Sequence, residues 1–349
     1  MNEELGFAVI GCGAIGPFHC RAIQEIKRTK LVIICDAIEK NAKKMGEEFG
    51  VKWTTNLNEV LSLPEVDVVN ICTPSGMHRD MAVAGAKAKK HLIIEKPLDI
   101  TLPKCDAIIK TARENKVKLA VIFPSRFKDG ALKLKKAMEQ NRFGRIALAD
   151  AYVKWYRSQE YYNSGAWRGT WQMDGGGALI NQSIHTVDLL QWLMGNIDSL
   201  VSYTGTISHK IEVEDTACAI VKFKNGSLGV IEGTTSSYPG MDARIAIHGE
   251  KGTGILDDGK ITEWNFKEPE PSDQEIKITQ DISSSGAADP TKALSHEFHR
   301  RQIADMVEAI NNNREPLVNG EEGRKAVEII LAIYESSKKG KEIRLPLRY

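Results

Sequence analysis

The chain has 349 residues and a formal net charge of +1 at pH 7, with 42% hydrophobic and 27% charged residues. This length exceeds what one hydrophobic core usually serves, so we expect two domains. A near-neutral charge without a basic block gives no electrostatic reason to expect nucleic acid or an anionic membrane as a partner. No apolar run approaches the ~20 residues that a membrane-spanning helix needs.

The first residues and the cysteines indicate a cellular compartment. The start, MNEELGFAVIG, carries acids where a secretory signal peptide has basic residues. The six cysteines include no C-x-x-C pair, and most lie in apolar segments. Because such cysteines are typical of buried, reduced thiols, we expect a cytoplasmic protein.

The first 124 residues alternate short apolar runs with helical stretches. Strands are expected over residues 7–10, 31–35, 66–73, 91–95 and 119–123, and helices over about 17–26, 40–49, 79–88 and 102–114. Strand alternating with helix is typical of a parallel, doubly wound α/β sheet. We therefore predict such a domain over residues 1–124.

A glycine-rich motif, GCGAIG, lies between the first strand and the first helix. In this context Gly11 allows a tight turn, Gly13 lets the backbone approach a pyrophosphate, and Gly16 lets helix and strand pack closely. The phosphates would face the N–H groups at the start of the helix. We expect the remaining residues of the motif to line the same cofactor site: Cys12, Ala14 and Ile15.

An acid follows at the distance that a dinucleotide fold requires. Asp36 ends the second expected strand, about 20 residues beyond the motif, where an acid typically holds the ribose diol. Its carboxylate would repel a 2′-phosphate, and Ala37 and Ile38 offer no cation to bind one. The sequence therefore favours NAD over NADP.

The stretch CTPSGMH leaves the carboxyl end of a central strand, which in an open α/β sheet is the edge that binds the cofactor. Thr73, Pro74 and Ser75 are therefore candidates for lining the nicotinamide half of the dinucleotide. His78 is a candidate cofactor contact, but it can equally cap the helix that follows.

The stretch HLIIEKPLDI ends a neighbouring strand on the same edge. Lys96 would then point toward the same crevice, with its direction set by Glu95 and by Pro97, which cannot continue a sheet interior. Ion pairs in clefts are often functional, so we favour a functional Lys96. The alternative is that Lys96 only pairs with Glu95 at a loop.

From about residue 125 the pattern changes to alternating segments joined by short turns, among them the hairpin signal KNGS. Strands without crossover helices predict an antiparallel sheet, here in a domain over residues 125–349. Helices are expected at about 131–144, 295–311 and 321–338, and polar loops at 268–276 and 281–290. A broad sheet with one uncovered apolar face predicts a homodimer or homotetramer.

A helix is expected over Ala178–Met194, after three glycines that would let a ligand approach closely. Asn181, His185 and Asp188 fall on one face of that helix. A lone helical histidine is more often a packing residue than a catalyst. Here His185 shares its face with an amide and an acid, which makes it a candidate catalytic residue.

The run HEFH (His296 and His299) raises the possibility of a metal site. It lacks the i, i+4 spacing of H-E-x-x-H, and the sequence offers no evident third ligand. We therefore favour no metal.

The motifs GCGAIG, TPSGMH and EKP, in this order and spacing, resemble the Gfo/Idh/MocA oxidoreductase family. The resemblance implies a Rossmann domain followed by an open-faced antiparallel sheet, and oxidation or reduction of a sugar or cyclitol hydroxyl. It also implies that Lys96 contacts the substrate hydroxyl and supports proton transfer, and that His185 is the general base. Glu95 and Lys96 would both border the cofactor.

This sequence departs from the family at one position. Relatives usually show Asp-x-x-x-His on this helix, whereas Asn181 stands here in place of the acid. Asp188 would then orient His185, or Asn181 would bind a substrate hydroxyl while Lys96 shares the role of base.

Further stretches, EYYNSGAWRGTW, IEVEDTA and IRLPL, resemble the branch of UDP-N-acetylglucosaminuronate 3-dehydrogenases and glycoside 3-dehydrogenases. This resemblance implies that Trp167 and Arg168 contact the cofactor. It also implies substrate contacts from Arg126, Tyr156 and Arg157.

These observations lead to a first hypothesis of an NAD-dependent dehydrogenase that acts on a nucleotide sugar or glycoside, at C3. A myo-inositol or free-sugar dehydrogenase is the second. A non-catalytic nucleotide or sugar sensor is a third hypothesis, because a fold alone does not determine function. The presence of both Lys96 and His185 favours an enzyme.

Overall fold

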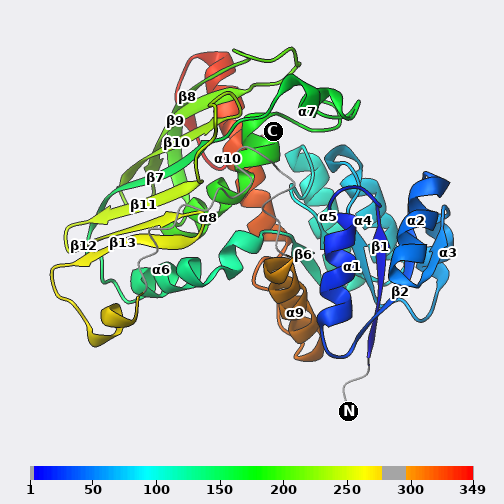
Figure 1. Cartoon of the computed structure of the whole chain (residues 1–349). Coiled ribbons are helices and arrows are strands. Elements are labelled where there is room, and N and C mark those ends of the chain that lie inside the picture. Colours follow the sequence, from blue (N-terminus) through cyan, green and yellow to red (C-terminus); the bar gives the residue numbers. More distant parts are fainter. Residues whose placement is uncertain (1–3, 277–295, 349) are drawn as a thin grey trace. The chain divides into compact units, whose positions relative to one another are not determined.

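The computed structural model describes residues 4–276 and 296–348 (Figure 1). The chain divides into two compact units. Unit 1 holds residues 1–124 and 295–324, and unit 2 holds residues 125–294 and 325–349. The chain first passes from unit 1 to unit 2 after residue 124, the position at which we placed the domain boundary. Residues 295–324, which we expected in the second domain, belong to unit 1.

Unit 1 is built on a six-stranded sheet in the order β3-β2-β1-β4-β5-β6, with every paired strand parallel. The predicted doubly wound parallel sheet is therefore confirmed. The three-residue β3 and the helix after it were not expected, because segments this short carry little periodicity. The strands are β1 (Leu5–Ile10), β2 (Thr29–Cys35), β3 (Lys52–Thr54), β4 (Val68–Ile71), β5 (His91–Ile94) and β6 (Leu119–Val121).

The helices of unit 1 follow the expected alternation. Gly50, the expected end of the second helix, adopts a left-handed conformation (φ 67°) as its C-cap. The helices are α1 (Gly16–Glu25), α2 (Glu39–Phe49), α3 (Leu57–Ser62), the 3₁₀ turn η1 (Ser75–Met77), α4 (His78–Lys87), α5 (Leu102–Asn115) and α9 (Glu297–Asn311).

The return of α9 to unit 1 has a simple physical cause. Its apolar residues Ile303, Met306 and Val307 are buried in the same core as Phe7 and Ile93 of the parallel sheet. Burying such side chains contributes about 1.5–3 kcal/mol each, so the helix packs where this core accepts it.

Unit 2 contains an eight-stranded sheet in the order β13-β12-β11-β7-β10-β9-β8-β14. Most neighbours are antiparallel, as predicted, and β7 and β10 pair in parallel at its centre. Short turns indicate the direction only of strands that they join, and β7 and β10 are separated by a long connection. The strands are β7 (Ile146–Lys154), β8 (Ile197–Gly205), β9 (Thr216–Phe223), β10 (Leu228–Thr234), β11 (Arg244–Gly249), β12 (Gly252–Asp257), β13 (Lys260–Phe266) and β14 (Ile343–Arg344).

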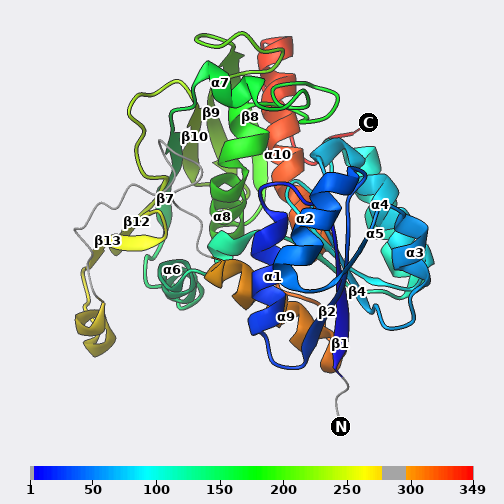
Figure 2. The same ribbon diagram turned by 45° about the vertical axis from the view of Figure 1, so that its right-hand side comes forward.

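Among the described residues, the helices of unit 2 pack on one face of this sheet (Figures 1 and 2). Along β9, Ala217, Ala219 and Val221 are buried under the helices, whereas Cys218 and Ile220 between them are exposed. The predicted open face is therefore confirmed. The helices of unit 2 are α6 (Asp129–Glu139), α7 (Gln159–Asn163), the π-helix η3 (Ala178–Ser183), α8 (Ile184–Met194) and most of α10 (Gly320–Lys339), with 3₁₀ turns η2 (Pro124–Phe127), at the boundary, and η4 (Pro271–Glu275).

Three further expectations concern helices and loops. The single helix expected over residues 178–194 is two segments, η3 and α8, because its first turn is a π-helix. The expected loop at 268–276 contains the short η4, and the loop expected at 281–290 lies outside the described residues. Among the described residues, no helix is long and apolar enough to cross a membrane.

Candidate active site

The turn between β1 and α1 has the geometry that a dinucleotide needs. Gly11 adopts φ 103°, and a Cβ there would lie 2.6 Å from the carbonyl of Cys72. A Cβ on Gly16 would lie 2.5 Å from the carbonyl oxygen of Gly11, whereas a Cβ on Gly13 would meet nothing within 4 Å. Two glycines thus permit close packing of the turn, and the third leaves open space where a pyrophosphate approaches.

Asp36 lies against this turn. Its Oδ2 accepts a hydrogen bond from the backbone N–H of Cys12 at 2.7 Å, and its Oδ1 accepts one from the N–H of Ile38 at 2.8 Å. Ala37 and Ile38 are exposed and uncharged. The carboxylate is therefore held beside the glycine turn with no cation at the two positions that follow it, an arrangement that fits NAD.

The loop after β4 carries Thr73, Pro74 and Ser75 at the carboxyl edge of the sheet, where we expected them. His78, in contrast, is 1% exposed, and its two ring nitrogens contact the carbonyl oxygens of Pro97 (2.8 Å) and Thr73 (2.9 Å). Both nitrogens are engaged with the backbone. This geometry favours a structural link between the two loops over the cofactor contact that we expected of His78.

Glu95 points into unit 1 and not toward the sheet edge. It is 7% exposed, its Oε1 lies 2.9 Å from His19 Nε2 and 3.7 Å from His299 Nε2, and its Oε2 accepts the backbone N–H of Lys96 at 3.1 Å. Burial by itself would raise the pKa of Glu95, but hydrogen bonds from His19 and His299 hold it well below its usual range. Glu95 thus accepts the backbone N–H of Lys96, and its contacts favour a supporting role over the cofactor contact that we expected.

His19, Glu95 and His299 bring three ligand-type atoms within 4.8 Å of one another, and all three are buried. The sequence analysis missed this cluster because its members lie far apart in the chain. Asn70 Nδ2 lies 2.8 Å from His19 Nδ1, which leaves the other ring nitrogen free to donate to Glu95. Hydrogen bonds account for both ring nitrogens of His19, whereas His299 Nε2 lies 3.7 Å from the same Glu95 oxygen. We assign no metal to this cluster. His296 lies elsewhere, 2.8 Å from Glu25.

In unit 2, His185 is the second residue of α8 and is partly exposed. Two of the three glycines before this segment lie close to other parts of the protein. A Cβ on Gly176 would lie 2.1 Å from the hydroxyl of Tyr334, and one on Gly177 would lie 1.9 Å from the carbonyl oxygen of Glu214. Gly176 and Gly177 therefore allow close packing within the protein.

The two polar neighbours of His185 have partners of their own. Asn181 Nδ2 donates to Asp174 Oδ1 at 2.5 Å. Asp188 accepts two hydrogen bonds from Arg126, at 2.8 Å and 2.6 Å, and neither side chain has exposed surface. This buried pair connects η2 with α8 and favours a positioning role for Arg126 over the substrate contact that we expected.

Arginine and aromatic side chains form a second group in unit 2. The Arg157 guanidinium is 3% exposed, lies over the rings of Trp155 (5.0 Å) and Tyr161 (5.6 Å), and donates to Gln182 Oε1 at 3.0 Å. The Arg168 guanidinium also lies over the Tyr161 ring, at 4.5 Å, and over the ring of Trp167, at 4.5 Å.

The residues at the centre of this group were missed by the sequence analysis. The Tyr161 hydroxyl accepts hydrogen bonds from Arg168 (2.7 Å) and Gln182 (2.8 Å), and Gln182 also donates to Asn181 Oδ1 at 3.0 Å. Gln182 thus connects the arginine and aromatic group to the segment that carries His185. The EYYN stretch was the available signal, but nothing in it distinguishes Tyr161 from Tyr162. Tyr156 is partly exposed, with its ring 5.3 Å from that of Tyr238.

Two family models match this chain over nearly its whole length. Residues 5–123 match the oxidoreductase family's NAD-binding Rossmann fold, and residues 135–345 match the C-terminal alpha/beta domain of the same family. The first unit is therefore an NAD-binding Rossmann domain, which confirms the predicted cofactor class.

Solved structures and curated proteins that are similar to this chain include several dehydrogenases. The WlbA dehydrogenase from Bordetella pertussis, in complex with NADH and UDP-GlcNAcA, is 35% identical with a TM-score of 0.91, covering 100% of this chain and 99% of that chain. The WlbA dehydrogenase from Chromobacterium violaceum, with the same two compounds, is 33% identical with a TM-score of 0.90, covering 100% and 98%. Myo-inositol 2-dehydrogenase of Thermotoga maritima is 27% identical, covering 97% of each chain.

The glycine turn, the acid beside it and the two matched domains lead to one conclusion: this chain belongs to the Gfo/Idh/MocA oxidoreductase family.

Proposed function

We propose that this protein is an NAD-dependent dehydrogenase that acts on a hydroxyl of an acidic nucleotide sugar, at C3. One observation carries the proposal. The guanidinium groups of Arg157 and Arg168 both lie over the ring of Tyr161, so two positive charges are grouped at one place in unit 2. Guanidinium groups are the preferred partners of carboxylates and phosphates. The 35% identity to a dehydrogenase crystallised with UDP-GlcNAcA supports the same substrate class.

The residues of unit 1 would bind and orient the cofactor. The open space at Gly13 accepts the pyrophosphate, and Asp36 holds the ribose diol. NAD, when bound, supplies the acceptor for a hydride. Thr73, Pro74 and Ser75 are proposed to line the nicotinamide half.

Two groups would handle the hydroxyl proton. We assign His185 as the base that removes it and Lys96 as the ammonium that stabilises the developing negative charge on oxygen. Asn181, Tyr156 and Arg157 are proposed as substrate contacts, and Trp167 and Arg168 as contacts near the cofactor. The hydrogen bond from Gln182 to Asn181 connects these sets within unit 2.

A second candidate is a polyol or free-sugar dehydrogenase, favoured by the full-length similarity to myo-inositol 2-dehydrogenase. The two are separated by incubating the purified protein with NAD and, in turn, UDP-N-acetylglucosaminuronate, UDP-N-acetylglucosamine, an alkyl glucoside and myo-inositol, with NADH absorbance as the readout. The proposal expects turnover of the uronate and little of its neutral counterpart. Turnover of myo-inositol alone would select the second candidate, and no turnover of any would favour a sensor.

We also propose that the protein is a homodimer or homotetramer of the cytoplasm. The open face of the unit 2 sheet exposes a set of apolar side chains that monomers usually keep from water: Leu148, Val201, Tyr203, Ile220 and Leu228. Five of the six cysteines are buried or partly buried as free thiols, which suits a reducing compartment.

A further inference from the structure

Two neighbouring acids, Glu214 and Asp215, lie immediately before β9. Glu214 is 4% exposed and Asp215 has no exposed surface. Buried carboxylates are expensive unless several donors satisfy them, so their partners show what each one is for. Although the two residues are adjacent, they have entirely different partners.

Glu214 holds the entrance of the π-helix η3. Its carboxylate accepts the N–H groups of Gly177 (3.0 Å) and Leu179 (2.8 Å) and the hydroxyl of Tyr334 (2.9 Å), and its carbonyl oxygen accepts the N–H of Ala178 (3.0 Å). N–H groups at the start of a helix have no partner within the helix. Glu214 therefore supplies the acceptors that fix where this helical segment begins.

The segment that Glu214 fixes carries the proposed proton-handling group. Asn181 lies in η3, and His185 follows in the first turn of α8. A π-turn is a costly irregularity that persists where surrounding contacts require it, commonly at functional sites. Because the backbone is continuous and helical, the entrance that Glu214 sets also sets the direction of His185.

Asp215 holds a different segment, the loop that follows β8. Its Oδ1 accepts the N–H of Ile207 at 2.9 Å, and its Oδ2 accepts the N–H groups of Ser208 (2.7 Å) and His209 (2.9 Å). The same Oδ2 lies 3.0 Å from His209 Nδ1. Burial opposes ionisation of Asp215, but these donors hold its pKa below the usual range.

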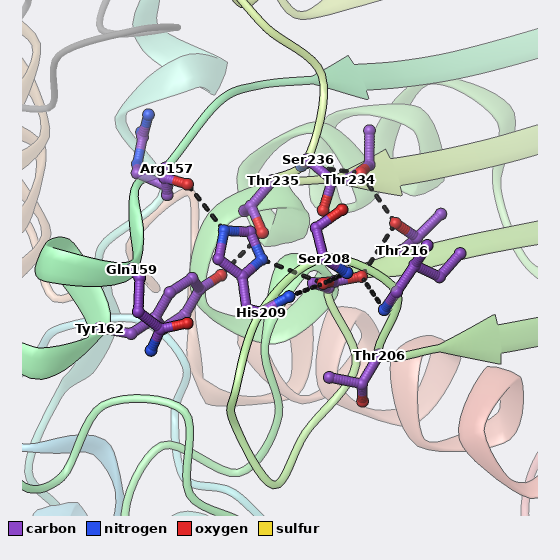
Figure 3. Close-up of polar contacts among 12 residues, drawn as sticks. Arg157, Gln159, Tyr162, Thr206, Ser208, His209, Thr216, Thr234, Thr235 and Ser236 are labelled. Atoms are coloured by element: carbon purple, nitrogen blue, oxygen red, sulfur yellow. Dashed lines mark hydrogen bonds and ion pairs between the residues drawn. The ribbon is translucent and has the colours of Figure 1, made fainter.

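His209 carries this anchoring on to Arg157. Figure 3 shows a dashed line from the His209 ring to the Arg157 carbonyl oxygen, a contact of 2.7 Å from Nε2. The ring of His209 thus lies between the Asp215 carboxylate and the backbone of Arg157. The N–H of Arg157 donates to the carbonyl of Thr235 at 2.8 Å. The backbone of Arg157 is thus held on both sides.

We propose that Glu214 and Asp215 are positioning residues for two separable parts of the reaction. Glu214 directs His185, and Asp215, through His209, directs Arg157. This inference rests on the proposed function, in which His185 handles a proton and Arg157 contacts the substrate. It follows that weakening the first anchor lowers kcat, whereas weakening the second raises KM.

The test uses two variants of each anchor in the full-length protein, with NAD and UDP-N-acetylglucosaminuronate. Glu214→Gln and Tyr334→Phe are expected to lower kcat about tenfold or more, with KM changed by less than about threefold. Asp215→Asn and His209→Gln are expected to raise the KM of the nucleotide sugar about tenfold, with kcat changed by less than about threefold. Glu212→Gln removes a charge from the same loop at an exposed position and serves as the matched control.

Each variant is checked for its unfolding temperature and for NADH binding. If Asp215→Asn does not fold, His209→Gln carries its part of the test. A similar change of kcat and KM in all four variants, or near-parent values in all four, would overturn the inference.

Amide hydrogen exchange distinguishes failure of this inference from failure of the proposed function. If the parent protein turns over none of the substrates, Glu214→Gln is still expected to increase exchange at residues 177–179, and Asp215→Asn at residues 207–209. Exchange that rises equally at both places in both variants, or in neither, contradicts two separate anchors regardless of the substrate.

Discussion

At the scale of single residues, the structure separates side chains that would touch ligands from those that hold them in place. Lys96 and His185 are partly exposed, whereas Glu95, His78 and Arg126 are buried and bonded to other parts of the protein. A catalytic side chain needs access to its substrate, while the groups that orient it need dry, well-packed surroundings. Burial and these contacts favour a supporting role for Glu95, His78 and Arg126.

Removal of either proposed proton-handling group is expected to affect turnover and spare the cofactor. Lys96→Ala and His185→Ala should each lower kcat about 10²-fold or more while NAD binding stays near the parent value, because the glycine turn and Asp36 are unchanged. The double variant should lose less than the product of the two, since the groups act as a unit. Steady-state kinetics and NADH fluorescence titration measure both quantities.

The matched control for Lys96→Ala is Lys87→Ala, which removes the same charge from an exposed position on α4. Its turnover should equal that of the parent. Near-normal turnover in both the Lys96 and the His185 variants would refute the assigned roles.

Cofactor choice is expected to depend on the charge of Asp36. Asp36→Asn removes the charge that repels a 2′-phosphate. Its single carbonyl oxygen can still accept one of the two N–H groups, of Cys12 and Ile38, that the carboxylate holds. The preference for NAD over NADP should therefore narrow by about tenfold, or about 1.4 kcal/mol. Calorimetric titration of both cofactors into the parent and the variant measures the ratio. Equal affinity of the parent for the two cofactors would contradict the role of Asp36.

At the scale of elements, several departures from expectation have one cause. The parallel pairing of β7 with β10, the π-turn before α8 and the return of α9 to unit 1 all depend on contacts between segments far apart in the chain. Local periodicity predicted that strands and helices exist there. It carried no information on which distant strand, carboxylate or core each of them would meet.

The anchor of η3 is expected to make the stability of the protein depend on pH. Burial raises the pKa of Glu214 from 4.5 to about 7, so between these values the folded protein holds a proton that the unfolded chain has lost. The free energy of unfolding therefore falls as the pH rises through this window, by at most about 1.4 kcal/mol per unit. Glu214→Gln cannot titrate and should lack this part of the dependence.

The measurement is urea unfolding of the parent and of Glu214→Gln at several pH values between 5 and 8. The difference between the two free energies is informative, because other titrating groups contribute equally to both. A difference that stays constant across this range would mean that Glu214 ionises in the folded protein as it does in water.

At the scale of the whole molecule, the open face of the unit 2 sheet is the feature that most needs a partner. Tyr203 is 79% exposed and Ile220 is 65% exposed on adjacent strands. Apolar side chains grouped on a flat sheet favour association with a second copy. We expect Ile220→Lys to shift the proposed dimer or tetramer to a smaller species in multi-angle light scattering.

Leu317→Lys provides the control, because it adds the same charge at an exposed apolar position in unit 1. It should leave the molar mass unchanged. A parent protein that is monomeric at micromolar concentration would exclude this interface.

The sequence by itself determined the features that depend on short, continuous stretches. The turn at Gly11–Gly16, Asp36 at the end of the next strand and the alternation of strand with helix identified the fold and the cofactor. These were predictable because a dinucleotide turn and a parallel strand are encoded by residues within a few positions of one another.

Only the tertiary structure decided how the candidate site is supported. Arg126 pairs with Asp188 across 62 residues of chain, His19 with Glu95 across 76, and Tyr334 with Glu214 across 120. A buried carboxylate accepts hydrogen bonds from whichever donors the fold brings near it. Because those donors lie far away in the chain, no local sequence pattern identifies them. The sequence therefore predicts which groups would do chemistry, and the fold shows which groups pack against and bond to them.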